Sequence, residues 1–126
     1  MSETVIEEYP DGCRIVHEER MYPDLYHFER EGEIRLKSFK NPDKARLYAD
    51  LYEVVDGFKE DNTGTRGVPP TIARDREEIR MAYFTATMSS TYAAGAFEVE
   101  ESEVLTAVYR VRERAKTLRS QQTSDE

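Results

Sequence analysis

The first forty residues alternate between apolar and polar positions, and turn-forming residues interrupt this alternation. Residues 9–12 read Tyr-Pro-Asp-Gly, with proline and glycine where a tight β-turn favours them, between the stretches 4–8 and 13–19. A second alternating stretch, 25–37, is interrupted by the charges and glycine of 30–33. These patterns predict two hairpins, and therefore an antiparallel β-meander of three or four strands. One face would be buried, and the other would carry charges of both signs that can pair across strands.

The spacing of apolar residues changes from every second to about every 3.6 positions after Asn41. Asn41 before Pro42 is typical of a helix start, with asparagine as the N-cap, and Gly57 is typical of the residue that follows a helix. The apolar residues between them form a stripe wider than one sheet needs to cover. We therefore predict a helix that packs on the sheet and also on another helix.

Two longer helices are predicted in the C-terminal half, after a break at residues 59–69 that is rich in glycine and ends in paired prolines. Small and apolar residues recur with helical spacing from about 71 to 94, and Gly95 follows as a stop. Ser102 can cap a further helix that reaches to about Arg119. Apolar residues in that helix alternate steps of four and three, as in a short coiled-coil seam.

These elements predict one α+β domain over residues 1–119: the meander, a helix packed on it and two longer C-terminal helices, followed by a polar, frayed tail at 120–126. The apolar seams of the two C-terminal helices exceed what the short sheet can cover. We interpret them as the interface of a homodimer, because a chain with few large apolar residues gains core by sharing it. These seam residues are Ala82, Ala86, Ala93, Val104, Val108, Val111, Ala115 and Leu118.

The charge balance argues against several classes of partner. Lys+Arg number 18 and Asp+Glu number 26, and the formal net charge of −8 opposes a general affinity for nucleic-acid backbones and anionic lipid. Arginine outnumbers lysine by 13 to 5 in this acidic chain, a balance that resembles proteins from salt-loving archaea. That resemblance implies a surface adapted to salt, although ordinary cytoplasmic proteins reach the same net charge.

The sequence favours a reducing cytoplasm. The acidic first residues lack the basic and apolar regions of a secretory signal, and the single cysteine, Cys13, cannot form an intramolecular disulfide. The longest uncharged stretch, 81–97, has 17 residues and contains five serines and threonines, so it is too short and too polar for a membrane span. We predict a cytoplasmic protein without membrane contact.

Residues suited to metal binding or nucleophilic catalysis are few. Cys13 and His17 share a strand face but lie about 13 Å apart at roughly 3.3 Å per residue, and His27 could approach only one of them. A zinc or copper site needs three or four ligands, and a catalytic cysteine needs an oriented base. Adjacent carboxylates such as Glu77 and Glu78 diverge on a helix and fit solvation or capping. We expect no metal, no cofactor and no catalytic residue.

One loop could hold a small anion. Residues 62–67 offer backbone donors, hydroxyls and a cation ahead of a helix start, with Thr65, Arg66 and Gly67 as the candidate contacts. The loop lacks the lysine ending of a P-loop, and the element before it is predicted as a helix instead of a strand. A flexible connector is the alternative interpretation.

Basic residues are concentrated in the last predicted helix. They could contact phosphates, or they could complement the negative end of the helix dipole and flank the apolar seam. The acidic remainder of the chain favours the second interpretation. The five cations are Arg110, Arg112, Arg114, Lys116 and Arg119.

Two short segments resemble parts of DNA-binding families. Residues 26–58 are similar to the small sheet-and-helix units of phage-type integrases, which implies a sheet that grips DNA. The sheet surface here alternates glutamate with arginine and lysine instead of presenting a basic face. Residues 67–71 resemble the helix-opening segment in the winged helix of the SOS-response repressor, but 72–94 offers no turn before a recognition helix. We transfer neither function.

Taken together, the pattern predicts a non-enzymatic cytoplasmic protein that works through association, as a homodimeric interaction or regulatory module. Two alternatives remain open. One is a nucleic-acid-associated regulator that uses the basic helix from Arg110 to Arg119, and the other is a binder of a small anionic ligand at the 62–67 loop.

Overall fold

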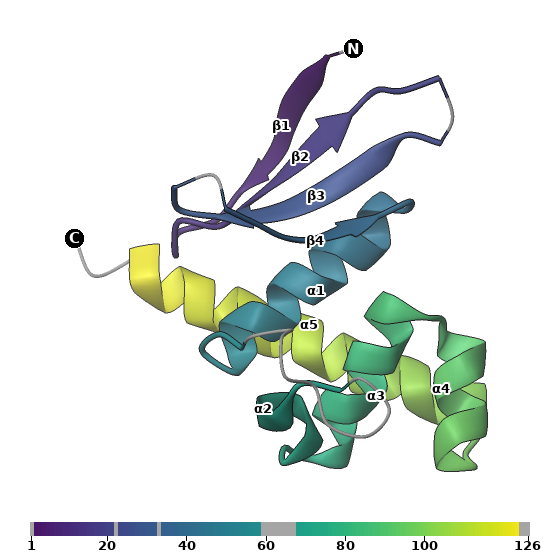
Figure 1. Ribbon diagram of the computed structural model, residues 1–126. Coiled ribbons are helices and arrows are strands. Elements are labelled where there is room, and N and C mark those ends of the chain that lie inside the picture. The colour runs from purple at the N-terminus through teal and green to yellow at the C-terminus, as the bar shows by residue number, and fades with distance from the viewer. Residues whose placement is uncertain (1, 22, 33, 59–67, 124–126) are drawn as a thin grey trace.

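Four antiparallel strands form the N-terminal part of the protein, in the spatial order β1-β2-β3-β4 (Figure 1). The structure is a computed structural model that describes residues 2–21, 23–32, 34–58 and 68–123. Its strands are β1 (Glu3–Glu8), β2 (Arg14–Glu18), β3 (Leu25–Arg30) and β4 (Ile34–Phe39). The predicted meander is confirmed.

The first turn forms at the predicted place because its residues satisfy their own backbone. The N–H of Gly12 donates to the carbonyl of Tyr9 over 3.0 Å, and Gly12 adopts a positive φ of 91°. Asp11 accepts a hydrogen bond from the N–H of Cys13 through Oδ1, at 2.9 Å. An aspartate that binds a backbone amide two residues ahead is a common turn device. The turn therefore sets the register in which β1 and β2 pair.

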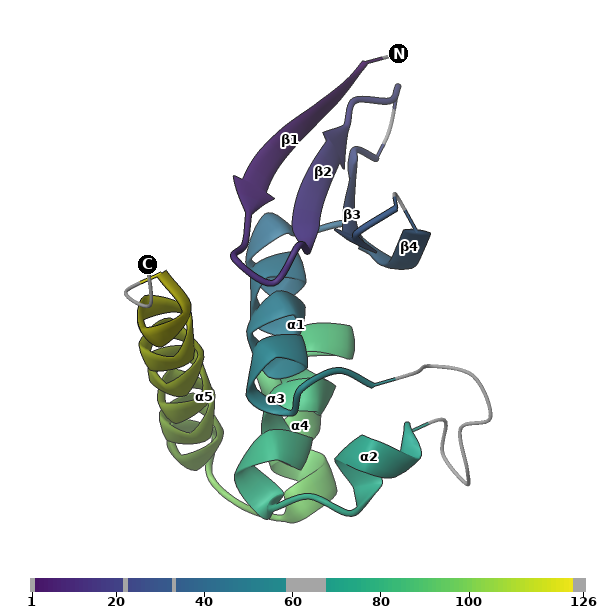
Figure 2. The same cartoon turned by 90° about the vertical axis from the view of Figure 1, so that its left-hand side faces the viewer.

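Helices and the segments that connect them follow the sheet (Figure 1). The helices are α1 (Pro42–Val54), α2 (Pro70–Ala73), α3 (Glu77–Thr87), α4 (Ser90–Phe97) and α5 (Glu101–Thr123). Figure 2 shows α1 between the sheet and the other helices, with α5 at the edge of the helical layer. The α+β prediction, a strand meander followed by helices, is confirmed.

The helix α1 begins as its sequence predicted. Asn41 caps it by accepting hydrogen bonds from the N–H groups of Asp43 and Lys44, at 2.7 and 3.2 Å. The chain leaves the helix through Gly57, which adopts a positive φ of 90°. The wide apolar stripe is used on both sides, because α1 packs on β2, β3 and β4 and also on α3 and α5. Both expected contacts of this helix are therefore present.

Aromatic rings join the sheet to the helical layer. Tyr48 of α1 is fully buried, and its ring lies 5.4 Å from that of Phe28 on β3 and 5.2 Å from that of Phe39 on β4. On its other side the ring lies 5.2 Å from Phe58 and 6.4 Å from Tyr83 of α3. Offset and edge-to-face pairs at these distances add to the energy of burial. Tyr48 is thus a central residue of the core.

The predicted single helix over 71–94 is wrong, because the chain forms α2, α3 and α4 there. Arg76 is extended, with φ −63° and ψ 159°, and its N–H binds the side chain of Asp75 at 2.7 Å. The second break lies at Met88, and the Ser89 hydroxyl then accepts a hydrogen bond from the N–H of Tyr92 at 2.9 Å. Such side chains compete with the helix for backbone groups. The apolar residues keep their helical spacing across both breaks, so this spacing did not indicate where the helix is interrupted.

The ends of the last two helices also differ from the prediction. The helix α4 passes Gly95 and ends at Phe97, and Glu98 takes the left-handed conformation with φ 55°. The helix α5 continues to Thr123, four residues beyond the predicted end at Arg119. Its last turn is held to α1 by side-chain contacts, so residues beyond Arg119 still gain tertiary partners.

Candidate functional site

The seam residues lie inside a single chain. Seven of the eight are 0 to 8% exposed, and Leu118 is partly buried, because α1, α3, α4 and α5 pack on one another. Small side chains at the contacts between these helices allow their axes to approach closely. The surplus of apolar helix surface that suggested a dimer is covered within one copy. The homodimer stays a prediction, and any such interface must use other residues.

Large apolar side chains are exposed on another face of α5, about 100° around the helix from the seam. Leu105 is 53% exposed and Tyr109 is 63% exposed, and residues four apart lie on one face of a helix. Met88, which lies just before α4, and Tyr92, which lies in the first turn of α4, are also exposed. This row was not predicted from the sequence because the seam residues already account for the apolar period of the helix. The signal that could have found it is the second row, offset from the seam by one residue.

Three of the five predicted phosphate contacts are engaged within the protein. Arg110 pairs with Glu78 of α3, with Nη1 2.8 Å from Oε1. Arg112 and Arg119 both pair with Asp50 of α1, at 3.3 and 2.5 Å. These contacts connect residues 32 to 69 positions apart, which no local pattern reveals. The basic helix is therefore in large part a structural element.

The other two cations, Arg114 and Lys116, are exposed. Within the part of the chain that the structure describes, neither forms an ion pair with an acidic residue. They are separated by two positions and so point to different sides of α5. The structure does not bring all five basic residues together on one surface.

Asp50 is the centre of a buried polar network between α1 and α5. It is only 6% exposed, and burial raises the pKa of its carboxyl, while its bonds to Arg119 and Arg112 act in the opposite direction. The guanidinium of Arg119 also lies 4.1 Å from the ring centre of Tyr9 and 3.7 Å from Oε1 of Glu53. A buried carboxylate of this kind is tolerated because its partners are in place. The network fixes the C-terminal half of α5 against α1.

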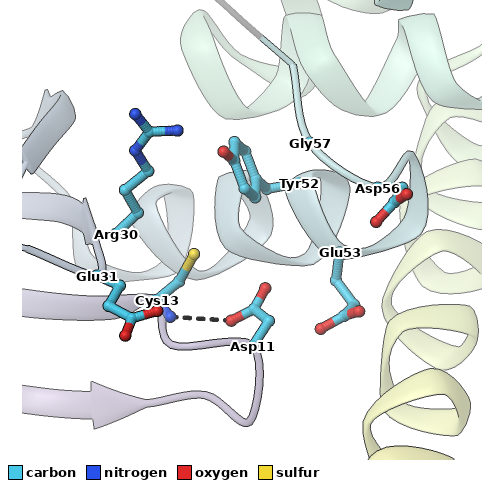
Figure 3. A pocket seen from close by; sticks show the side chains of 8 residues that line it. All are labelled: Asp11, Cys13, Arg30, Glu31, Tyr52, Glu53, Asp56 and Gly57. Atoms are coloured by element: carbon cyan, nitrogen blue, oxygen red, sulfur yellow. Dashed lines mark hydrogen bonds between the residues drawn. The ribbon is translucent and has the colours of Figure 1, made fainter.

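A pocket of about 430 Å³ lies where the two hairpin turns meet the C-terminal end of α1 (Figure 3). Its lining combines carboxylates with one guanidinium, one phenol and one thiol, as the side chains in Figure 3 show. The eight lining residues are Asp11, Cys13, Arg30, Glu31, Tyr52, Glu53, Asp56 and Gly57.

The charge of this acidic pocket favours cationic groups over anions. Four of its side chains carry carboxyl groups and only Arg30 carries a positive charge. Burial raises the pKa of Glu53, and the negative charge of Asp11 raises it further. Burial penalises a charge of either sign, and the effect of Asp11 shows that a further negative charge is unfavourable at this position. A small anion therefore has no favourable site here.

The thiol in the acidic pocket is not suited to act as a nucleophile. Cys13 is buried, and burial followed by the charge of Asp11 raises its pKa to about 12. The thiolate is the reactive species, and reactive cysteines lie in electropositive surroundings that lower the pKa. The acidic pocket has the opposite charge. Cys13 thus fits a structural role in the first hairpin.

Alkylation of Cys13 should be slow in the folded protein. At pH 8 a thiol with a pKa of about 12 carries roughly a thousandfold less thiolate than an unfolded cysteine. We expect the rate with a small alkylating reagent to fall by a comparable factor between unfolded and native protein, as followed by mass spectrometry. Asp11→Asn keeps an oxygen for the Cys13 amide and removes the charge, so it should accelerate native alkylation several-fold. Glu31→Gln is the matched control, and a native rate within tenfold of the unfolded rate would contradict the assignment.

The two histidines contact different side chains in and beside the sheet. His17 stacks on Tyr26 with ring centres 4.6 Å apart and contacts Asp24 at 3.0 Å. His27 is buried and contacts Glu18 at 2.8 Å and Ser38 at 2.6 Å. In the described ranges, no three His, Cys, Asp or Glu residues are arranged to hold a metal ion.

The remaining candidate contacts, Thr65, Arg66 and Gly67, lie outside the described residues, so the structure does not place the predicted anion loop. None of the helices from α1 to α5 combines the length and apolar content that a membrane span requires. The chain matches no protein-family model, no curated protein and no solved structure, so the function must be argued from its own residues.

Proposed function

We propose that this protein is an association module that works as a homodimer and supplies a surface instead of chemistry. The observation that carries the proposal is the pair Leu105 and Tyr109, which the longest helix holds exposed on one face. Exposed apolar residues that are grouped on a rigid element are typical of protein interaction sites. The covered seam residues play no part in this proposal.

The chemistry of the rest of the molecule supports a binding role. The only cysteine carries a protonated thiol at neutral pH, and the acidic pocket repels the anionic intermediates that many enzymes stabilise. Histidine, the usual general base, is engaged by Asp24 at one position and by Glu18 and Ser38 at the other. None of these groups is arranged as a nucleophile with an oriented base.

The nucleic-acid alternative has less support. A phosphate-binding surface needs several cations that point outward together. Arg110, Arg112 and Arg119 are instead bound to carboxylates of the same chain, and the net charge is −8. Arg114 and Lys116 alone would neutralise two phosphates, which gives weak, salt-sensitive binding at most.

Light scattering tests the proposed dimer directly. We expect a mass of twice 14.7 kDa at tens of micromolar, and a shift towards the single-chain mass on dilution. The series should be run at low and at molar potassium chloride, with circular dichroism as a control that the acidic chain is folded. A folded protein that keeps the mass of one copy throughout this range would refute the proposal.

A further inference from the structure

The helix α5 is electrically divided along its length. Exposed acids lie at and just before its start, namely Glu98, Glu100, Glu101 and Glu103. The basic half, from Arg110 onward, holds the five basic residues, with Glu113 as its one acid. This division has the same sense as the helix dipole, in which the N-terminal end favours acids and the C-terminal end favours bases. The exposed Leu105 and Tyr109 lie between the acidic start, which ends at Glu103, and the basic part, which begins at Arg110.

Three side chains of the basic half, Arg112, Lys116 and Arg119, lie within about 40° of Leu105 around the helix axis, and Lys116 is the one of them that is not bonded to Asp50. At about 100° per residue, Leu105, Tyr109 and Lys116 lie within about 40° of one another around the helix axis. All three are exposed. We call these three residues the outer stripe. Arg112 and Arg119, which point towards α1, are excluded from it by their bonds to Asp50.

We propose that a second copy of this chain docks along the outer stripe with the two α5 helices antiparallel. The two-fold axis passes between Leu105 and Tyr109, so that each Leu105 packs on the Tyr109 of the other copy. Self-complementary contacts of this kind are what a two-fold interface requires. This inference rests on the proposed homodimer and adds its surface and its geometry.

The charges select the antiparallel arrangement. With the axis at the level of Ala107, Lys116 is nine helical residues from the axis on one side, and the first turn of α5 with the acidic segment 98–101 lies on the other side. Lys116 of each copy then faces that acidic segment at the start of α5 in the other copy, where opposite charges attract. A parallel arrangement would place Lys116 against Lys116 and the acidic turns against each other. That arrangement is disfavoured by repulsion between like charges.

The neighbouring helix extends the contact area. The hydroxyl of Ser90 donates to Glu101 at 2.6 Å, so the start of α4 is fixed beside the first turn of α5. Exposed Met88 and Tyr92 lie within two residues of Ser90. The helix α5 has 23 residues and is about 35 Å long at 1.5 Å per residue. A helix of this length with added apolar residues can supply the roughly 800 Å² per copy of a standard interface.

Substitutions that add or reverse a charge test whether the outer stripe is the dimer surface. Leu105→Glu should weaken dimerisation at least tenfold, because it puts a charge into the apolar contact, whereas Met21→Glu, a similar change at an exposed residue of the connection between β2 and β3, should leave it unchanged. Lys116→Glu should also weaken the dimer, and adding Glu98→Lys and Glu100→Lys to Lys116→Glu should restore it. Sedimentation equilibrium measures all five proteins. A dimer that Leu105→Glu leaves intact would overturn this inference and leave the proposed function standing, whereas a monomeric parent protein would overturn both.

Cross-linking tests the orientation independently of affinity. On a Cys13→Ser background, we would mix Lys116→Cys copies with Glu100→Cys copies and add a short bismaleimide. The antiparallel dimer should give a mixed product. The two Lys116 positions are 18 residues apart along the axis, about 27 Å, so Lys116→Cys alone should not couple to itself. Efficient coupling of Lys116→Cys to itself would overturn the antiparallel arrangement, and melting curves of each variant confirm that it is folded.

Discussion

Replacing Tyr48 by alanine should destabilise the protein by about 3 to 5 kcal/mol, as is usual when a buried aromatic ring is removed. The ring of Tyr48 contacts rings from β3, β4, α3 and the segment after α1, so the cavity would open where the sheet meets the helices. Urea denaturation followed by circular dichroism measures the loss. A domain of this size has about 5 to 15 kcal/mol of stability in total, so the variant should be close to unfolding at 37 °C.

Two variants make the Tyr48 experiment specific. Tyr48→Phe keeps the ring and its aromatic contacts, so it should lose less stability than Tyr48→Ala. Tyr109→Ala removes the same kind of side chain from an exposed position of α5, and its effect on the folded single chain should stay within about 0.5 kcal/mol. A loss below about 1 kcal/mol for Tyr48→Ala would mean that the core is not arranged around this ring.

The second large effect is expected at Asp50. Asp50→Ala leaves the guanidinium groups of Arg119 and Arg112 without their shared carboxylate in a largely buried place. Breaking one side of a buried ion pair costs about 3 to 5 kcal/mol, and the partial exposure of Arg112 places this variant near the lower end. Thermal and urea unfolding should both report the loss.

Two further variants show whether Asp50→Ala loses stability because its ion pairs are broken or only because a side chain is removed. Asp43→Ala, on the same helix, breaks an exposed ion pair with Arg46 and should cost less than about 1 kcal/mol. Combining Asp50→Ala with Arg119→Met removes both buried charges, so the double variant should be more stable than Asp50→Ala alone. A double variant that is less stable than the single one would contradict the ionic explanation.

Local signals predicted the N-terminal half of the fold well. The turn at residues 9–12 and the start of α1 each depend on a side chain that binds backbone groups two or three residues away, Asp11 in the turn and Asn41 at the helix. Interactions over so few residues are written in consecutive sequence and are therefore readable from it. The width of the apolar stripe on α1 also predicted that the helix would pack on two sides.

The C-terminal half was less predictable because its apolar period continues across interruptions. Ser89 and Asp75 each have a helix-compatible sequence around them, and only the folded chain shows that they bind backbone groups and break the helix. The roles of the basic residues were hidden for a different reason. Arg119 and Asp50 are 69 positions apart in the sequence, and a single sequence does not show which face of α5 packs on which face of α1.

The same limit applies to the candidate interface. A seam such as that through Val104 and Val108 marks a helix that needs a partner, but it does not say whether the partner is in the same chain. The structure assigns the seam to intramolecular packing and leaves Leu105 and Tyr109 on the outside. In the proposed dimer, the residues that matter are therefore those that remain exposed after the chain has packed its own core.

The position of α1 has a consequence for how the protein unfolds. Among the described elements it is the helix that contacts three strands on one side and both α3 and α5 on the other. Melting this one segment would strip both halves of their shared core at once. The meander and the helical bundle should therefore exchange their slowest amide protons at one common rate, as a single cooperative unit.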